Sequence, residues 1–139
     1  MNKKFTYLLA LALGCCLSVK AQIHSAPPSS TDSVFRRVDQ LPQFPGGIKA
    51  YYQYLTTSLR YPKAAYDKRL EGRTDVALII ERDGTVTGVK VKNSSGSEDL
   101  DAEAVRVISK SPKWVPGVQN GKTVRVAYML PIVFSLKKP

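Results

Sequence analysis

The sequence predicts an α+β domain, in which a three-stranded antiparallel sheet carries helices packed on one face. Three observations support this fold class: helical spacing of apolar residues in two separate stretches, a hairpin signal between them, and strict alternation in the last strand. The chain has 139 residues, which is room for one core. We expect residues 44–139 to form this single domain.

The domain is predicted to begin with two helices. The motif FPGG at 44–47 is a turn signal, and the apolar side chains that follow have the spacing of one helix face. These side chains are Ile48, Tyr51, Tyr52, Leu55 and Leu59. Pro62 is suited to the first turn of a second short helix, which we expect to run to about Leu70 and to stop at Gly72.

A β-hairpin is predicted next. Val76, Leu78 and Ile80 alternate with more polar neighbours, and Asp83–Gly84 is a strong signal for a two-residue turn. The apolar parity of the second strand changes across Gly88, which indicates a bulge or a twist at that residue.

A third helix is predicted around residues 98–109. Its core face holds Leu100, Ala104, Val107 and Ile108, and its first turn carries the acidic residues Glu98, Asp99, Asp101 and Glu103. Acidic side chains at a helix start are favoured by the helix dipole, so we expect no metal ion here, although four carboxylates leave a metal site as an alternative.

The last strand is the most informative element. From Val124 to Leu136 every even position is apolar, so one face of a long strand is predicted to be buried. Pro131 lies near its middle, and proline belongs at sheet edges or bulges because it cannot donate a hydrogen bond. If this strand pairs with the first strand of the hairpin, the sheet order is second, first, third, and one side of the last strand is left unpaired.

The residues before the domain are expected to direct export. Lys3 and Lys4 precede an apolar run, and Ala21 ends a signal-peptidase pattern, so we expect residues 1–21 to be a cleaved signal peptide. The run spans about 22 Å as a helix, which is short of a hydrocarbon core of about 30 Å. An inner-membrane anchor and a lipoprotein acylated at Cys15 remain alternatives. Residues 22–43 are polar and are expected to be a disordered tether.

Composition argues against several classes of function. The formal net charge is +10, or +7 once the three lysines of the signal are removed, but the basic residues form no concentrated stripe, so nucleic acid is not an expected partner. The only histidine, His24, lies in the tether, and no glycine-rich phosphate loop follows a strand. We therefore predict no enzymatic activity and no cofactor.

Several motifs, taken in order over about ninety residues, resemble the C-terminal domain of TonB energy transducers, in the form found in Bacteroidetes-type sequences. The motifs are FPGG at 44–47, YPKAA at 61–65, EGRTDVALIIERDGTVTGVKV at 71–91, LDAEAVRVI at 100–108, and PKWVPGVQNGKTVRVAYMLPIVF at 112–134.

The resemblance implies a way of binding. Domains of this family recognise outer-membrane receptors by strand addition, in which an extended receptor segment pairs with the last strand. The matching residues of this chain are Tyr61, Pro62 and Lys63, together with Thr123, Val124, Arg125, Val126, Ala127, Tyr128, Met129 and Leu130. Many transducers have an arginine two positions beyond the proline, where this chain has Ala64.

The expected function is that of a periplasmic TonB-like domain that binds a segment of TonB-dependent receptors and supports energy-coupled transport across the outer membrane. Contact with inner-membrane motor proteins is expected only if the chain is anchored. The alternative is an envelope interaction or self-association module that uses the same edge strand, as a homodimer for example, without a role in transport. Sequence alone does not choose between them.

Overall fold

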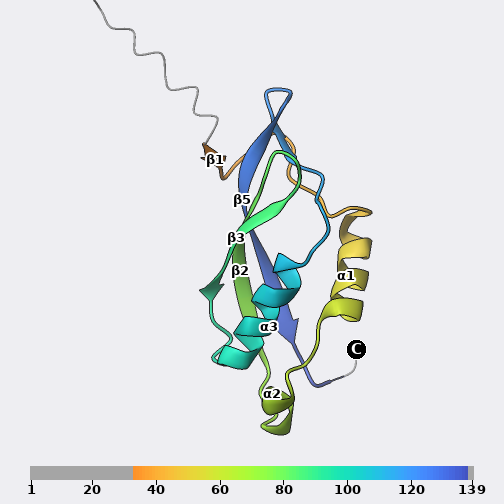
Figure 1. The fold of residues 1–139 in the computed structure, drawn as a ribbon, viewed down its shortest axis with the longest axis vertical. Coiled ribbons are helices and arrows are strands. Elements are labelled where there is room, and N and C mark those ends of the chain that lie inside the picture. Colours follow the sequence, from red (N-terminus) through yellow and green to blue (C-terminus); the bar gives the residue numbers. More distant parts are fainter. Residues whose placement is uncertain (1–32, 138–139) are drawn as a thin grey trace, which may run out of the picture. The chain divides into compact units, whose positions relative to one another are not determined.

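The computed structural model describes residues 33–137, which form one α+β unit (Figure 1). The predicted signal peptide and the first part of the predicted tether lie outside the described residues. The elements, in chain order, are β1 (Val34–Phe35), α1 (Gly47–Ser58), α2 (Lys63–Asp67), β2 (Gly72–Ile80), β3 (Val86–Asn93), α3 (Glu98–Ser109), β4 (Gly117–Gln119) and β5 (Lys122–Phe134).

The sheet confirms the predicted order and adds two short strands. β3, β2 and β5 lie side by side and antiparallel, in the predicted order of second, first and third. β1 pairs in parallel with β5, and β4 forms a tight hairpin with β5, so the sheet is mixed and has five strands rather than three. Strands of two and three residues are too short to give a periodic signal in the sequence.

The expected tether contributes to the fold. Val34 and Phe35 pair with Arg125 and Val126 of β5. Gln40 and Gln43 exchange backbone hydrogen bonds of 2.8–3.0 Å with Val118 and Val115. The boundary expected at Phe44 therefore falls inside the folded unit, because the backbone groups of this polar segment have partners there.

The hairpin between β2 and β3 differs in one detail from the prediction. Its turn is longer than two residues, because the Glu81 amide donates to the Thr85 carbonyl at 2.8 Å. Gly84 has φ 85°, and a β-carbon at this residue would lie 1.9 Å from the Trp114 carbonyl oxygen. The expected irregularity at Gly88 is confirmed by its φ of 58° and by the register shift between Ala77 and Ile79.

The core lies between α3 and the sheet. Leu100, Ala104, Val107 and Ile108 are fully buried, as their spacing predicts. Five of the even-numbered apolar residues from Val124 to Phe134 are also buried, and Tyr128 packs against the core as a partly buried side chain. The Ser97 hydroxyl caps α3 by accepting from the Leu100 amide at 3.5 Å.

Two hydrogen bonds link helix α1 to α3. The Tyr54 hydroxyl donates to the Val107 carbonyl at 2.8 Å, and the Arg106 guanidinium donates to the Ser58 carbonyl at 2.8 Å. Of the stripe predicted to be buried, only Tyr51 is, while Ile48 and Tyr52 are 66% and 62% exposed. Part of the apolar face of α1 is therefore uncovered.

Candidate functional site

The outer edge of β5 is open from Ala127 onward. β1 pairs only with Arg125 and Val126, and no described strand lies beyond β5 from Ala127 onward on that side. An uncovered edge presents a row of backbone N–H and C=O groups to solvent, and this row can pair with another extended chain.

The direction of each backbone group follows from the ladder. The Glu81 amide donates toward β3. The backbone N–H and C=O groups of successive residues in a strand point alternately to its two sides. The backbone groups of even-numbered residues in β2 therefore point toward β5. Their partners are the even-numbered residues of β5, such as Val126 opposite Ile80. The odd-numbered amides of Ala127, Met129 and Val133 therefore point to the outer edge.

Pro131 fits this geometry. It lies opposite Asp75 of β2 and is odd-numbered, so its nitrogen also points to the outer edge and no ladder bond to β2 is lost. The edge has no donor at this position, so the uninterrupted run of open backbone spans Ala127 to Leu130.

The structure divides the predicted contact residues among three surroundings. Thr123 and Val124 pair with β4, and Arg125 and Val126 pair with β1, whereas the four residues 127–130 lie along the open edge. Val118 exchanges hydrogen bonds with Gln40, so β4 meets the even-numbered side of β5, which is also the side of β2, and does not cover the outer side of Thr123. Within the predicted range, β1 covers the outer side at Arg125 and Val126.

The residues Tyr61, Pro62 and Lys63 lie at the other end of the strand. The Tyr61 ring packs edge-on against Phe134, the last residue of β5, with 5.8 Å between ring centroids, and its hydroxyl donates to the Leu70 carbonyl. Lys63 pairs with Asp67 at 2.8 Å on the surface. Tyr61 therefore lies beside Phe134, at the carboxyl end of β5.

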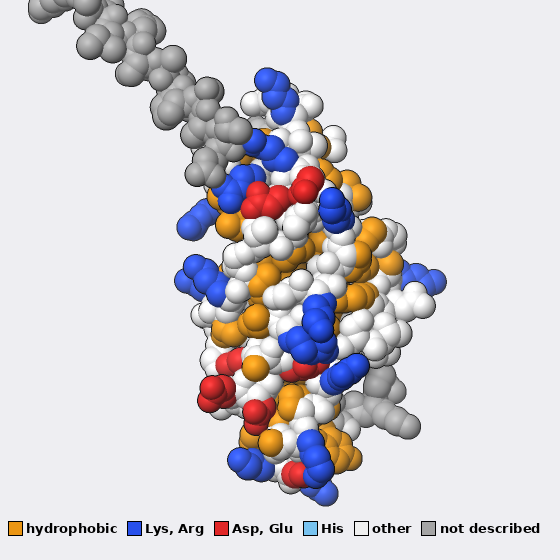
Figure 2. Space-filling model, viewed as in Figure 1, with side chains coloured by type: hydrophobic (Ala, Val, Ile, Leu, Met, Phe, Trp, Pro, Cys, Tyr) orange, Lys and Arg blue, Asp and Glu red, His pale blue; other side chains and the backbone are white. Residues whose placement is uncertain are grey.

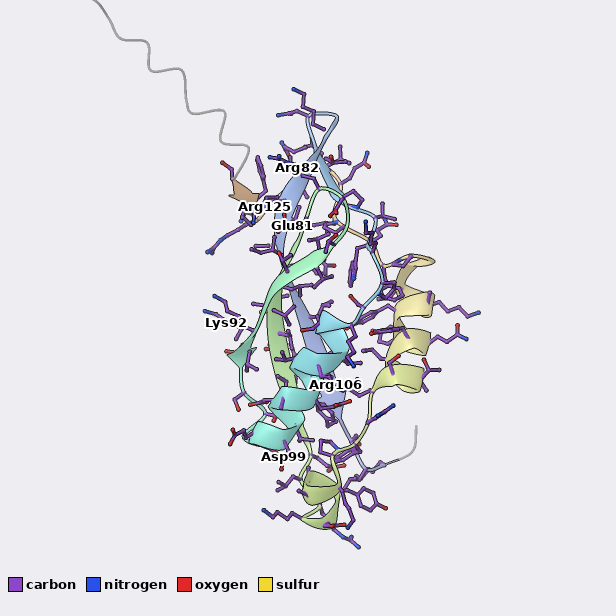
Figure 3. All side chains as sticks on the ribbon, in the orientation of Figure 1. Glu81, Arg82, Lys92, Asp99, Arg106 and Arg125 are labelled. Atoms are coloured by element: carbon purple, nitrogen blue, oxygen red, sulfur yellow. The ribbon has the colours of Figure 1, made fainter. Side chains whose placement is uncertain are left out.

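Arg125 is not a solvated charge at the edge. Its guanidinium donates to the Glu81 carboxylate at 2.7 Å, and both side chains are about three-quarters buried (Figure 3). Hydrogen bonds from Arg125 and then from Thr87 hold the pKa of Glu81 below its ordinary value. This ion pair joins β5 to Glu81, the residue that follows β2, at the point where β1 stops covering the outer edge.

A groove separates α1 from β5. Its upper part is a cavity of about 350 Å³, and its lower part is a cavity of about 360 Å³. The upper cavity is lined by Pro42, Gln43, Phe44, Gly47, Ile48, Tyr51, Trp114, Tyr128 and Leu130. The lower cavity is lined by Tyr52, Leu55, Thr56, Leu59, Pro131, Ile132 and Val133. Neither lining contains a charged side chain.

Aromatic packing builds the wall of the upper cavity. Phe44 packs edge-on against Tyr51 and Trp114, with ring centroids 5.6 and 5.4 Å apart, and Trp114 packs against Tyr128 at 5.8 Å. The Tyr51 hydroxyl is buried and has no hydrogen-bond partner among the described residues, and burial raises its pKa well above the ordinary value. The Tyr51 ring is therefore held by packing in the core and not by a hydrogen bond of its hydroxyl among the described residues.

The acidic turn of α3 serves the fold. The Asp101 carboxylate accepts from the Thr74 hydroxyl at 2.8 Å and from the Ser95 amide at 2.9 Å, and the Glu103 carboxylate accepts from the Arg60 amide at 2.7 Å. Within residues 33–137 no cluster of histidine, cysteine, aspartate or glutamate could hold a metal ion. The same residues contain no helix long and apolar enough to cross a membrane.

The comparison with known families identifies this architecture. The C-terminal domain of Gram-negative bacterial TonB proteins matches residues 57–136. The chain belongs to the TonB C-terminal domain family. The match covers α2, α3 and the whole of β2, β3, β4 and β5, so the open edge of β5 lies within it.

Individual TonB proteins are similar to this chain. Protein TonB of Helicobacter pylori strain J99 is 31% identical over 98 residues, which cover 68% of this chain and 34% of that protein. Protein TonB of Haemophilus influenzae is 40% identical over 52 residues, or 37% of this chain and 19% of that protein. The chain thus spans about a third of the length of the Helicobacter relative.

A solved TonB domain supports the fold. The solution structure of the Helicobacter pylori TonB C-terminal domain aligns with a TM-score of 0.50 and 28% identity, over 66% of this chain and 96% of that chain. The predicted α+β class is thereby confirmed.

Two features of the site were not predicted from the sequence. The pairing of Val34 and Phe35 with β5 had only two adjacent apolar residues as a signal, inside a polar stretch. The groove could not be predicted, because the apolar stripe of α1 indicated that the whole stripe would be buried. A stripe does not show which of its residues the fold covers.

Proposed function

We propose that this chain is a TonB-like envelope protein that binds an extended segment of TonB-dependent outer-membrane receptors by strand addition to β5, and that it supports energy-coupled transport in this way. The observation that carries the proposal is the open edge from Ala127 to Leu130 in a member of this family. An extended peptide can satisfy these backbone groups while its side chains contact the flanking surfaces.

The position of the edge in the fold supports this proposal. β5 pairs with β2 along nine residues, from Val126 to Phe134, so the strand that would accept a partner is fixed in place on its other side. A rigid edge does not have to be ordered on binding, which lowers the entropic cost of association.

The surface charge is compatible with exposure in the envelope. Basic side chains are spread over the face shown in Figure 2 and do not gather in one stripe. A net positive charge accelerates encounters with acidic segments without fixing their sequence. We infer a periplasmic location for residues 33–137, on the basis of the signal peptide predicted for residues 1–21.

The proposal is tested by calorimetric titration of the full chain with peptides that copy the extended periplasmic segments of outer-membrane receptors from the same genome. Ala127→Pro removes one outward amide and no ladder bond to β2, so it should reduce affinity at least tenfold while the unfolding midpoint is retained. If this variant unfolds, peptides N-methylated at alternate residues provide the same test from the partner's side.

Strand addition predicts that one of the two alternating N-methylation patterns abolishes binding and the other does not. Equal binding of both patterns, or no binding of any receptor segment, would contradict the proposal. Sedimentation of the chain alone distinguishes self-association, because pairing of two β5 edges would give a dimer whose population rises with concentration.

A further inference from the structure

The groove between α1 and β5 lies next to the open edge, where a paired segment would place its side chains. The lower cavity is lined both by Ile132, which is buried on the helix side of the sheet, and by Pro131 and Val133, which are exposed on the other side. A cavity that contacts both faces of one strand opens at the edge of that strand. An added strand would therefore run along the mouth of the groove.

The spacing of the two cavities matches an extended chain. The upper cavity contacts Tyr128 and Leu130, and the lower one contacts Ile132. Alternate residues of a strand point to the same face and are about 6.6 Å apart. Two helix-facing side chains of an added strand, two or four residues apart, would thus each meet one cavity.

The chemistry of the groove restricts those side chains. Both linings are uncharged, and α1 presents Ile48 to the upper cavity and Tyr52 to the lower one, each more than half exposed. The opposite face of the sheet carries ionised side chains, such as the Arg73–Asp75 pair and the Glu81–Arg125 pair. The two faces of an added strand would therefore meet very different surroundings.

We infer that the α1–β5 groove selects the segment that pairs with β5, by accepting large apolar or aromatic side chains at its helix-facing positions and excluding charged ones there. The partner is an extended peptide with apolar residues at alternate positions. This inference rests on the proposed function. It assigns to Ile48 and Tyr52 a role in specificity that depends on their incomplete burial, since a side chain already covered could gain nothing on binding.

The probe is an acetylated and amidated octapeptide of alternating threonine and valine, in which one central valine is replaced by phenylalanine, alanine or lysine. Affinity for the full chain is measured by NMR titration, with the amides of Ala127 and Met129 reporting on strand addition. We expect the phenylalanine peptide to bind about tenfold more tightly than the alanine peptide, because of the apolar area it buries. The lysine peptide should bind more weakly than either.

Two matched variants place the effect in the groove. Ile48→Lys adds a charge to the rim of the upper cavity, and Gln53→Lys adds the same charge to an exposed position of α1 outside both linings. We expect Ile48→Lys to weaken the phenylalanine peptide about tenfold and Gln53→Lys to change its affinity less than twofold. A glutamate guest should recover affinity for Ile48→Lys only.

The outcomes separate this inference from the proposed function. Amide shifts at Ala127 and Met129 that do not depend on the guest residue, or equal effects of the two lysine variants, overturn selection by the groove and leave strand addition in place. Failure of every octapeptide and every receptor segment to shift these amides overturns strand addition itself. Shifts confined to residues of the groove, without the edge amides, also overturn the inference.

Discussion

Helices α1 and α3 have the same length, twelve residues each, and both have an apolar stripe, but the fold uses them differently. α3 buries its whole stripe, and four of its side chains are fully inaccessible. α1 buries one side chain of its stripe and leaves Ile48 and Tyr52 mostly exposed beside the open edge of β5. The comparison teaches that an apolar stripe predicts a helix but not how far the fold covers it, and the exposed part of α1 is the surface to which we assign a role in binding.

The sharpest test of this comparison removes the same atoms from each helix. Ile108 on α3 is fully buried and Ile48 on α1 is 66% exposed. Ile108→Ala should lower the free energy of unfolding by about 2–5 kcal/mol, because it leaves a cavity in the core. Ile48→Ala should change it by no more than about 0.5 kcal/mol. Urea unfolding of the two variants measures both, and equal losses would contradict the assigned roles.

A second prediction concerns the support of Trp114, a wall of the groove. Gly84 has a positive φ, and a β-carbon at this residue would collide with the Trp114 carbonyl. Gly84→Ala should therefore lower the free energy of unfolding by about 2–3 kcal/mol and disturb the upper cavity. Gly121 also has a positive φ but has open space around it, so Gly121→Ala is the matched control and should cost only about 1 kcal/mol. Thermal unfolding and the Trp114 indole N–H resonance report the two effects. If Gly84→Ala lowered the free energy of unfolding no more than Gly121→Ala, the close approach of Gly84 to the Trp114 carbonyl would not matter for stability.

The third prediction concerns the ion pair between β5 and β2. The pKa of Glu81 is lowered in the fold, so its pairing with Arg125 stabilises the protein above the pKa of the unfolded state, and this contribution is lost as the pH falls through the folded pKa. Glu81→Gln should therefore lower the free energy of unfolding by about 1 kcal/mol at pH 7 and by progressively less as the pH falls. Urea unfolding at several pH values measures this difference. A cost that does not change between pH 7 and pH 3 would show that the charge is unimportant.

The smallest expected effect is at Tyr51, on the buried side of α1. Its hydroxyl has no hydrogen-bond partner among the described residues, so Tyr51→Phe removes a buried polar atom and no hydrogen bond. The free energy of unfolding should stay within about 0.5 kcal/mol of the wild type or rise slightly. A loss of 1 kcal/mol or more in urea unfolding would reveal an interaction of this hydroxyl that the packing does not account for.

The sequence predicted those parts of the fold whose signals are local. The stripe of Leu100, Ala104, Val107 and Ile108 and the alternation along β5 depend on the period of a single element, and both appear in the structure as predicted. The β2–β3 hairpin followed from the short connection between these strands, whereas the pairing of β5 with β2 entered the prediction as a condition, which the structure meets.

The rest depended on tertiary position. The exposure of Ile48 depends on how α1 is placed on the rest of the fold, and the partial burial of Arg125 depends on its pairing with Glu81, forty-four positions earlier. The extent of the open edge depended in the same way on Val34 and Phe35, which pair with a strand some ninety residues later. Composition and spacing carry little information about contacts of this kind.

Amide hydrogen exchange along β5 tests the central claim most directly. In the free chain we predict slow exchange at Val126, Tyr128 and Leu130, whose amides face β2, and fast exchange at Ala127 and Met129, whose amides face outward. A bound receptor segment should slow exchange at Ala127 and Met129 at least tenfold. Slow exchange at these two residues in the free chain, or fast exchange that no receptor segment changes, would contradict the account.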